Sequence, residues 1–374
     1  MLQRPGSDQG AAAAIHPVSV AVCEYADRRG FGLSAAAIRH ARSAGNAALV
    51  AIRRPSDDCG FPVLHRDGSW WRQRILDPVA LDEALDRHHP QVVHIHGIWT
   101  GALRHVARLQ RRGMAVVVSP HGMLDASLLA HGRLKKGLVD LWFHRAALRR
   151  ANGIHVLTAF EAGQVRSYLG ADHPGIRIIA NGIDLPDARV LSPHPHPRRS
   201  VLYCGRLHPS KRIHWLLDAW QGAAVHDRME LVIAGDGEDA YAQRMRARAA
   251  LLPGVRLLGY VGGAAKEAAF QASDFGILAG QCEAQSIAVL EALAYGKPCI
   301  ITPGCRYPAM RTLGWEGDSV AELATALRAA ADLPAERYAE LSGACRLQAA
   351  TEHDWTTIGQ RMLAWYDELA ARRA

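Results

Sequence analysis

Short apolar segments that suit buried strands alternate with helical patterns along nearly the whole chain, and this rhythm limits the fold more than any other feature. The strand candidates of the first half are residues 18–23, 47–52, 92–96, 115–119, 153–157 and 176–180. Those of the second half are residues 200–204, 230–234, 255–258, 274–278 and 298–302. Such alternation is typical of parallel sheets covered by helices on both faces. Two runs of it predict two doubly wound α/β domains.

The division into domains follows from the chain length and from a proline-rich tract. A chain of 374 residues exceeds the usual size of one hydrophobic core, so two domains are expected. Residues 192–197, Ser-Pro-His-Pro-His-Pro, can form neither a helix nor a central strand, and histidines between prolines favour a stiff linker over a metal site. We expect a flexible N-terminus at residues 1–16, a first domain at 17–185, a linker at 186–199, a second domain at 200–350 and a final helix at 351–374.

The final helix carries one apolar stripe, which predicts that it docks on another part of the protein. The stripe consists of Trp355, Ile358, Met362, Trp365, Tyr366 and Leu369.

Two glutamates with seven residues between them, Glu283 and Glu291, give the strongest indication of a ligand. Glu283 lies in a polar loop after an apolar strand candidate, and Glu291 lies inside a helix that Ser286 opens and that ends near Gly296. A carboxylate just before a helix can accept hydrogen bonds from sugar hydroxyls, and one about a turn and a half into the helix can bind a ribose diol. The outward-facing amides of residues 287–289 could bind a diphosphate. The arrangement therefore suits a nucleotide sugar.

Two cations follow an earlier strand candidate. Residues 201–204 indicate a buried strand that ends at Gly205, and the loop after it presents Arg206 and Lys211. Cations at the carboxyl end of a strand can clamp a diphosphate, because the negative charge of a leaving group needs a fixed positive partner when no metal supplies one. Arg206 and Lys211 are therefore candidate diphosphate ligands.

Together with three further motifs, these residues resemble the retaining glycosyltransferases of family 4. The further motifs are Pro120-His-Gly-Met-Leu-Asp125, Asn181-Gly-Ile-Asp184 and Ala234-Gly-Asp-Gly237. The resemblance runs from about residue 17 to residue 370, and the motifs are specific as an ordered set although none is specific alone. It implies the GT-B fold, in which two Rossmann-like domains face a central cleft and a final helix returns to the N-terminal domain.

The resemblance also implies which residues of the second domain bind the donor. They are Arg206 and Lys211 at the diphosphate, Glu291 at the ribose, Glu283 at the sugar, and Ser286 and Ile287 at the start of the helix. One departure concerns Ala284 and Gln285, which follow Glu283 where the family usually has glycine and then an aromatic or apolar residue. Alanine allows fewer backbone angles than glycine, and the family uses the amides of this loop to contact sugar hydroxyls. The identity of the donor sugar is therefore open.

In the first domain, the resemblance assigns His121 and a glycine-rich loop to the site. His121 would approach the donor sugar, and it directly follows a strand candidate, at the end where open parallel sheets bind ligands. The alternative is a histidine that only completes the turn after the strand. Gly30 and Gly32 would lie near the acceptor and the phosphate. No third metal-binding residue lies at a recognisable spacing from His94 and His96. We therefore expect these two histidines to lie in the core or in the wall of the cleft, not at a metal ion.

Composition bears on partners and on the compartment. The 44 basic and 36 acidic residues give a net charge of +8 and a pI near 9.3, which favours phosphate-bearing ligands or an anionic membrane surface without deciding between them. One predicted amphipathic helix carries a cluster of basic residues: Arg133, Lys135, Lys136, Arg145, Arg149 and Arg150. This helix could lie on such a membrane, or it could pack on the sheet and leave its charges in water. No exposed-looking aromatics accompany them, so nucleic-acid binding is not expected.

The expected location is the cytoplasm, with attachment to the inner face of the cytoplasmic membrane as an option. The seven cysteines show no pairing pattern of a secreted domain or of a zinc site. No apolar run approaches the ~20 residues of a spanning helix, and the start of the chain does not resemble a signal peptide.

The activity that the resemblance implies is transfer of a hexose from a nucleotide-diphosphate sugar to a hydroxyl of a glycan or lipid-linked glycan, with retention of anomeric configuration. The sequence contains no Asp-x-Asp element of the metal-using kind, so neither a metal ion nor a cofactor is expected. The resemblance suggests the synthesis of bacterial surface polysaccharide such as lipopolysaccharide.

Competing functions stay open at the level of sequence. A nucleotide-sugar epimerase or a phosphorylase would fit the same architecture, and a non-catalytic nucleotide-sugar-binding protein would fit the departure at Ala284 and Gln285. A dehydrogenase is less favoured, because the formal dinucleotide fingerprint from Gly235 to Ala240 contains three acids that would lie beside a pyrophosphate.

Overall fold

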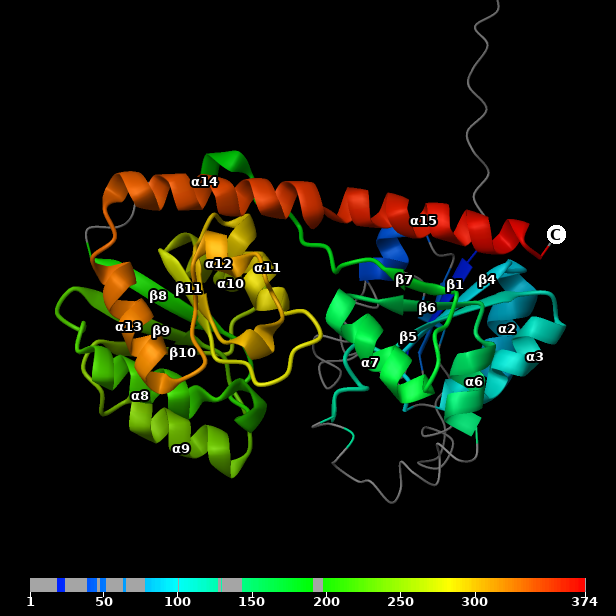
Figure 1. Ribbon diagram of the computed structural model, residues 1–374, viewed down its shortest axis with the longest axis horizontal. Coiled ribbons are helices and arrows are strands. Elements are labelled where there is room, and N and C mark those ends of the chain that lie inside the picture. The colour runs from blue at the N-terminus through cyan, green and yellow to red at the C-terminus, as the bar shows by residue number, and fades with distance from the viewer. Residues whose placement is uncertain are drawn as a thin grey trace, which may run out of the picture.

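A computed structural model gives the fold of the protein, in which helices cover two separate parallel sheets (Figure 1). The residues that the structure describes are 19–23, 39–45, 48–51, 63–64, 78–99, 101–126, 129, 143–190 and 198–373. The two sheets confirm the prediction of two doubly wound α/β units.

The N-terminal sheet has the strand order β3-β2-β1-β4-β5-β6-β7, and its pairings are parallel. Its strands are β1 (Ser19–Cys23), β2 (Ala48–Ala51), β3 (Val63–Leu64), β4 (Val92–His96), β5 (Ala115–Ser119), β6 (Gly153–Val156) and β7 (Ile176–Ile178). The described helices of this half are α2 (Pro78–His88), η3 (Gly101–His105), α3 (Val106–Arg111), α6 (Arg145–Arg150) and α7 (Ala159–Leu169). The strand order reverses between β1 and β4, and open parallel sheets usually bind ligands beyond the carboxyl ends of the strands at such a point.

The C-terminal sheet has the order β10-β9-β8-β11-β12-β13 and is parallel as well. Its strands are β8 (Arg199–Cys204), β9 (Met229–Ala234), β10 (Val255–Gly259), β11 (Phe275–Leu278), β12 (Cys299–Ile301) and β13 (Trp315–Glu316). The helices are α8 (Ile213–Ala223), α9 (Ala240–Ala249), α10 (Ala264–Gln271), α11 (Ile287–Ala294), α12 (Met310–Leu313) and α13 (Val320–Ala331), and the short 3-10 turns are η5 (Ala188–Val190), η6 (Pro209–Lys211) and η7 (Pro303–Cys305). Here the order reverses between β8 and β11.

The predicted strands agree with the observed ones to within two residues at each end. Residues 92–96 and 115–119 coincide with β4 and β5, where every residue is buried. No pattern predicts β3 or β13, since strands of two residues are too short for a periodicity to appear.

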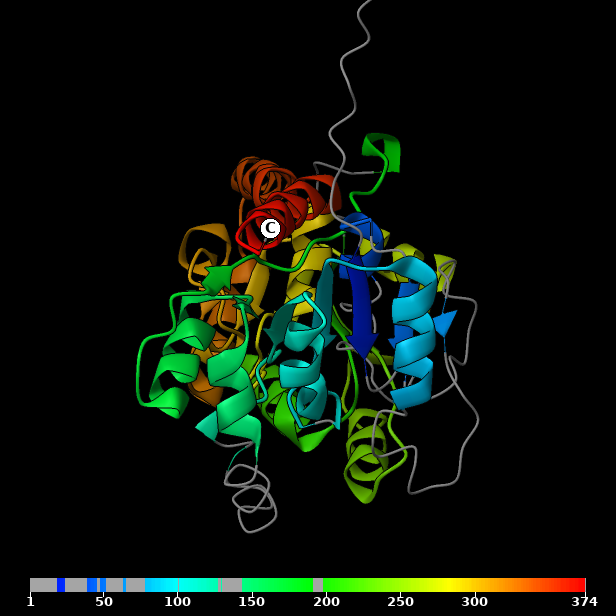
Figure 2. The same ribbon diagram turned by 90° about the vertical axis from the view of Figure 1, so that its right-hand side faces the viewer.

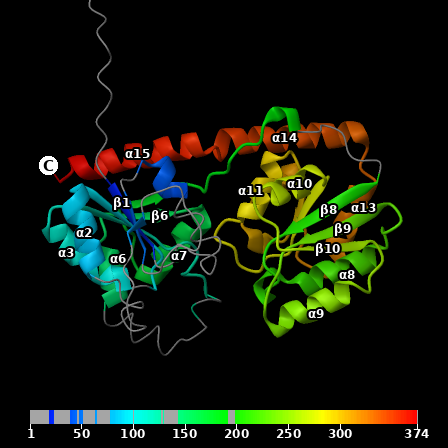
Figure 3. The ribbon, with the colours of Figure 1, turned by 180° about the vertical axis from the view of Figure 1, so that it is seen from behind.

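The last two helices connect the halves. α14 (Ala335–Glu352) packs on α11 and α12 of the C-terminal half, whereas α15 (Trp355–Ala371) packs on β4 of the N-terminal half. Figure 3 shows the two helices following each other along one side of both sheets, and Figure 2 shows them nearly end on. The apolar residues of α15 form one buried cluster with the N-terminal sheet: Ile358, Met362, Trp365, Tyr366 and Leu369 with Val92, Ala115, Val117 and Ile179.

One tight contact fixes α15 on the sheet and gives a stability prediction. A Cβ atom added at Gly153 of β6 would lie 2.4 Å from Cζ2 of the buried Trp365. We therefore expect Gly153→Ala to lower the free energy of unfolding by about 1–3 kcal/mol, since the core must shift to admit the methyl group. Gly163→Ala is the control, because no atom lies within 4 Å of a Cβ at this position in α7, where alanine favours the helix. Denaturant unfolding that shows equal stability for both variants would contradict this packing.

Candidate active site

The candidate donor site lies on loops at the carboxyl ends of β8, β10 and β11. These strands are parallel members of one sheet, so the loops that follow them gather at one edge. The loop after β8 carries Arg206 and Lys211, the loop after β11 carries Glu283, and Glu291 lies in α11. The structure thus brings the predicted donor-binding residues of the second half to one region.

Lys211 and Glu283 form an ion pair in this region. Lys211 Nζ lies 2.5 Å from Glu283 Oε1, and the two side chains are only 20% and 13% exposed. The Glu283 amide donates to the Gly304 carbonyl at 2.9 Å, and the Glu283 side chain passes close to Gly280, where an added Cβ would lie 3.0 Å from Oε1. Partial burial strengthens a charge-assisted hydrogen bond of this kind.

A second ion pair involves a lysine that the sequence analysis missed. Lys266 Nζ donates to Glu291 Oε1, and the Glu291 side chain is 13% exposed. Lys266 lies in the first turn of α10, just beyond the carboxyl end of β10, and that position at the sheet edge was the one signal that could have found it. Arg206 is exposed in the neighbouring loop, and its carbonyl accepts the hydroxyl of Tyr203 at 2.6 Å.

The start of α11 offers amide groups between the two glutamates. Ser286 is the N-cap residue and is buried, but its side chain makes no capping hydrogen bond. An N-cap side chain usually accepts a hydrogen bond from one of the first amides of its helix. The Ser286 side chain does not do so for the α11 amides that begin at Ile287. An N-terminus of this kind attracts anions, and it lies in the chain between Glu283 and Glu291.

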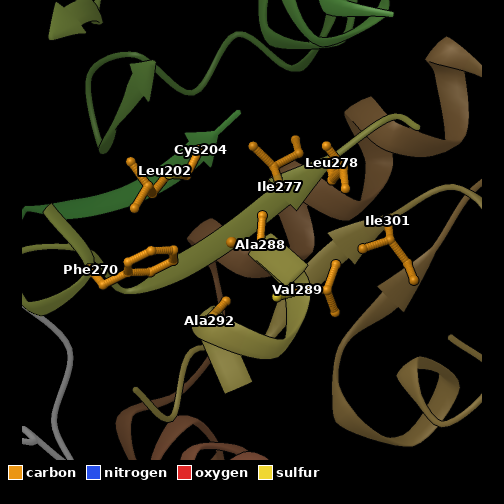
Figure 4. Close-up of a pocket in the computed structure, with 11 residues that line it drawn as sticks. Leu202, Cys204, Phe270, Ile277, Leu278, Ala288, Val289, Ala292 and Ile301 are labelled. Carbon is orange, nitrogen blue, oxygen red and sulfur yellow. The ribbon is translucent and has the colours of Figure 1, made fainter. Parts of the chain in front are cut away.

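A small apolar pocket beneath α11 is distinct from this site. It is lined by residues of β8, β11, β12, α10 and α11: Leu202, Cys204, Phe270, Gly276, Ile277, Leu278, Ala288, Val289, Ala292, Cys299 and Ile301 (Figure 4). These side chains offer a sugar or phosphate almost no hydrogen bonds. Burial, with the negative charge of Glu291, raises the pKa of the Cys204 thiol to about 12, so it is not a nucleophile at neutral pH. The pocket is a gap in the packing between the sheet and α11.

His121 of the N-terminal half is partly buried and lies against a group of four buried histidines, His40, His94, His96 and His155. His121 adopts a positive φ of 50° in the turn after β5, and its Nε2 lies 2.9 Å from His96 Nδ1. The rings of His94 and His96 stack with centroids 4.1 Å apart. His94 also contacts Tyr366 of α15 and Ser119, which ties the group to the final helix.

Burial keeps these histidines neutral. It lowers the pKa of His121 to about 3, with a further contribution from nearby His155. It also lowers the pKa of His155 to about 4, although the hydrogen bond to the Ile179 carbonyl opposes the shift. His121 therefore offers a neutral imidazole at pH 7, one of whose nitrogens shares a proton with His96.

The turn that carries His121 depends on Glu161, a residue that the sequence analysis did not single out. Its buried carboxylate accepts the amides of Gly122 at 2.6 Å and Leu157 at 2.7 Å. Burial raises the pKa of Glu161, and these two hydrogen bonds oppose the rise. Its signal in the sequence was a capping box, since Thr158 caps α7 by accepting the Glu161 amide.

The two halves touch beside the candidate site. A Cβ at Gly122 would lie 2.8 Å from the Ala284 Cβ, so the loop of His121 contacts the loop of Glu283. The Asn181 amide donates to Gln285 Oε1 at 2.7 Å. The guanidinium of Arg306 lies 3.6 Å from the ring centroid of Phe160, at the start of α7.

Several predicted features lie outside the described residues. These are Gly30 and Gly32, the N-terminus at residues 1–16, the proline-rich tract at residues 192–197, and Arg133, Lys135 and Lys136 of the basic helix. Two arginines of α6 have partners within the fold: Arg145 lies over the Tyr168 ring, and Arg149 donates to the Leu169 carbonyl at 2.6 Å. Among the described residues, no helix has the length and apolar character needed to cross a membrane.

Two family models match the chain and identify its class. A glycosyl transferase 4-like domain matches residues 9–182, and the glycosyl transferases group 1 model matches residues 198–332. The chain therefore belongs to the group 1 and 4-like glycosyl transferases, which confirms the resemblance to family 4 glycosyltransferases seen in its motifs, while retention of configuration stays a prediction. Among proteins with curated descriptions, none matches the sequence significantly.

Solved structures share the fold along nearly their whole length. HepE from Anabaena, solved in complex with UDP, is 15% identical with a TM-score of 0.71, and the match covers 93% of this chain and 98% of HepE. Sucrose-phosphate synthase from Thermosynechococcus elongatus is 16% identical with a TM-score of 0.71, covering 95% and 100% of the two chains. WaaG, a glycosyltransferase involved in lipopolysaccharide biosynthesis, is 16% identical with a TM-score of 0.65, covering 92% and 98%. At such identities the likeness concerns the fold alone.

Proposed function

We propose that this protein is a retaining glycosyltransferase that moves a hexose from a nucleotide-diphosphate sugar to a hydroxyl of a glycan or lipid-linked glycan. The observation that carries the proposal is the pair of lysine–glutamate contacts on either side of the α11 N-terminus, Lys211–Glu283 and Lys266–Glu291. Each pair supplies a carboxylate for hydroxyl groups and a cation for phosphate oxygens at one sheet edge.

The charges of the site suit departure of a diphosphate. As the bond between the sugar and the diphosphate breaks, the leaving oxygen gains negative charge, which Lys211, Arg206 and the α11 amides would stabilise more strongly than in the ground state. Lys211 would turn from Glu283 to the phosphate, which frees the Glu283 carboxylate to accept sugar hydroxyls. Glu291, held by Lys266, would bind the ribose. This division of roles needs no divalent metal ion.

His121 would contact the donor sugar from the opposite half. Its neutral imidazole can donate or accept a hydrogen bond without placing a positive charge beside the anomeric carbon, where positive charge develops during transfer. The acceptor hydroxyl would attack on the face that the leaving group vacates, with a donor phosphate oxygen taking its proton. The contact between the loops of His121 and Glu283 supports a site shared by the two halves.

The pathway proposed is synthesis of bacterial surface polysaccharide, supported by the fold that the chain shares with WaaG, a glycosyltransferase involved in lipopolysaccharide biosynthesis. A uridine nucleotide is the first donor to test, because HepE was solved with UDP. The net charge of +8 supports peripheral association with an anionic membrane at the cytoplasmic face, where a lipid-linked acceptor would be found.

The test is a thermal-shift screen against uridine, guanosine and adenosine diphosphate sugars, followed by assays of nucleotide release. Ligand at ~100-fold above its dissociation constant should stabilise the protein by ~2–3 kcal/mol. A transferase should release nucleotide rapidly only with an acceptor present. Release without an acceptor would favour an epimerase, release that requires inorganic phosphate would favour a phosphorylase, and binding without turnover would favour a sugar-nucleotide sensor.

Arg206→Ala and Lys211→Ala should lower turnover more than donor affinity, because the charge that they stabilise grows toward the transition state. We expect a loss in kcat of at least about tenfold with a smaller change in the dissociation constant of the donor. Arg244→Ala on α9, which removes an exposed cation elsewhere in the same half, is the control. Kinetics in which only the Michaelis constant rises would assign both residues to ground-state binding.

A further inference from the structure

Asn181, in a motif to which the proposed function assigns no role, connects three separate parts of the protein. It is buried, with 2% of its surface exposed. Its amide donates to Gln285 Oε1 at 2.7 Å, its carbonyl accepts from His353 Nδ1 at 3.1 Å, and its side-chain Oδ1 lies 3.2 Å from His40 Nε2. These partners belong to the loop of Glu283, to the junction of α14 and α15, and to the histidine group beside His121.

Gln285 provides the contact from the Glu283 loop. It lies two residues after Glu283 in the C-terminal half, and its side chain is buried against the segment that leaves the N-terminal sheet. The preceding residue, Ala284, touches Gly122. The Glu283 loop is therefore held at two points by the N-terminal half, once beside His121 and once at Asn181.

We propose that Gln285 is a positioning residue that couples the placement of Glu283 to closure of the two halves. The proposal rests on the proposed function, in which Glu283 and His121 act on the same sugar. In this proposal, separation of the halves would break the hydrogen bond between the Asn181 amide and Gln285 Oε1 and would expose both groups to water. An apolar side chain at residue 285 would leave a buried amide without an acceptor and would oppose closure.

The size of the effect follows from the usual strength of a hydrogen bond. One such bond shifts an equilibrium between open and closed forms by roughly five- to tenfold. The proposed contacts to the nucleotide belong to the C-terminal half, through Arg206, Lys211, Glu291 and the α11 amides. Loss of the Gln285 contact should therefore reduce transfer without reducing the affinity for a nucleoside diphosphate.

Two substitutions at residue 285 separate the hydrogen bond from simple packing. Gln285→Met keeps the length of the side chain and removes the acceptor, while Gln285→Glu keeps an acceptor. Gln281→Met makes the same chemical change at an exposed position of the same loop and is the control. The measurements are amide hydrogen exchange at Asn181, affinity for UDP by calorimetry, and transfer from the nucleotide sugar that the thermal-shift screen identifies.

The expected result is about tenfold faster exchange of the Asn181 amide and about tenfold lower kcat in Gln285→Met, with both largely restored in Gln285→Glu. UDP affinity should stay within about twofold in all variants. The proposal is overturned if the Asn181 amide of Gln285→Met exchanges at the parental rate, or if kcat falls as much in Gln285→Glu as in Gln285→Met. It is also overturned if UDP affinity falls together with kcat.

The unmodified protein gives a further test that does not depend on the folding of a variant. The Asn181 amide should exchange slowly in the free protein, and an unprotected amide there would overturn the coupling. A protein that binds no nucleoside diphosphate would instead contradict the proposed function, and the exchange data would still decide whether Gln285 holds the Glu283 loop.

Discussion

Replacement of Glu283 by glutamine should reduce sugar transfer on the order of 100-fold while leaving nucleoside diphosphate binding intact. The substitution keeps the size of the side chain but removes the charge that now pairs with Lys211 at 2.5 Å. Without that pair, Lys211 stays available to the diphosphate, so UDP affinity should remain constant or rise. The measurements are steady-state transfer and calorimetric UDP affinity.

Glu291→Ala is the matched comparison, because it removes the other carboxylate of the site. The proposed partner of Glu291 is the ribose, which donor and free nucleotide share. Glu291→Ala should therefore weaken the binding of both by about 1.5–3 kcal/mol. His121→Ala should lower transfer and spare nucleotide binding, as Glu283→Gln does. Folded Glu283→Gln and His121→Ala variants that transfer sugar at the parental rate would remove both residues from the proposed site.

Acidification from pH 7 to pH 5 should cost the protein most of its stability. Burial holds the pKa of five histidines below the ordinary value near 6.5, to about 3 for His121 and about 4 for His155; the others are His40, His94 and His96. The unfolded chain takes up these protons below about pH 6.5 and the folded protein does not, so the free energy of unfolding falls as the pH falls. Each histidine contributes roughly 2 kcal/mol to this loss by pH 5.

Denaturant unfolding at several pH values measures the effect. Because domains are stable by only about 5–15 kcal/mol, the N-terminal half should unfold near pH 5. His155→Gln removes one of these groups and should reduce the slope of stability against pH by about one proton, or ~1.4 kcal/mol per pH unit. His226→Gln, which removes a histidine at an exposed position, is the control. A free energy of unfolding that stays constant from pH 7 to pH 5 would show that the histidine group is hydrated.

The ion pairs at the candidate site could be predicted only in part. Glu283, Glu291, Arg206 and Lys211 stood out in the sequence because each has a recognisable place, before or inside a helix or after a strand. The pairing of these residues could not be predicted from the sequence. Lys211 and Glu283 are 72 residues apart and meet only because β8 and β11 are neighbours in the sheet. Lys266 was missed for the same reason, because its partner Glu291 lies on a different helix.

Local patterns in the sequence were enough to predict the alternation of strands and helices, the two sheets and the loops that carry the candidate site. These properties depend on local periodicity and on which residues end a strand or begin a helix. The tertiary structure decided which charges pair, that His94 meets Tyr366 across 272 residues, and that Gln285 contacts Asn181 in the other half. A hydrogen bond or ion pair requires two atoms within about 3 Å, and the packing of segments far apart in the sequence sets that distance.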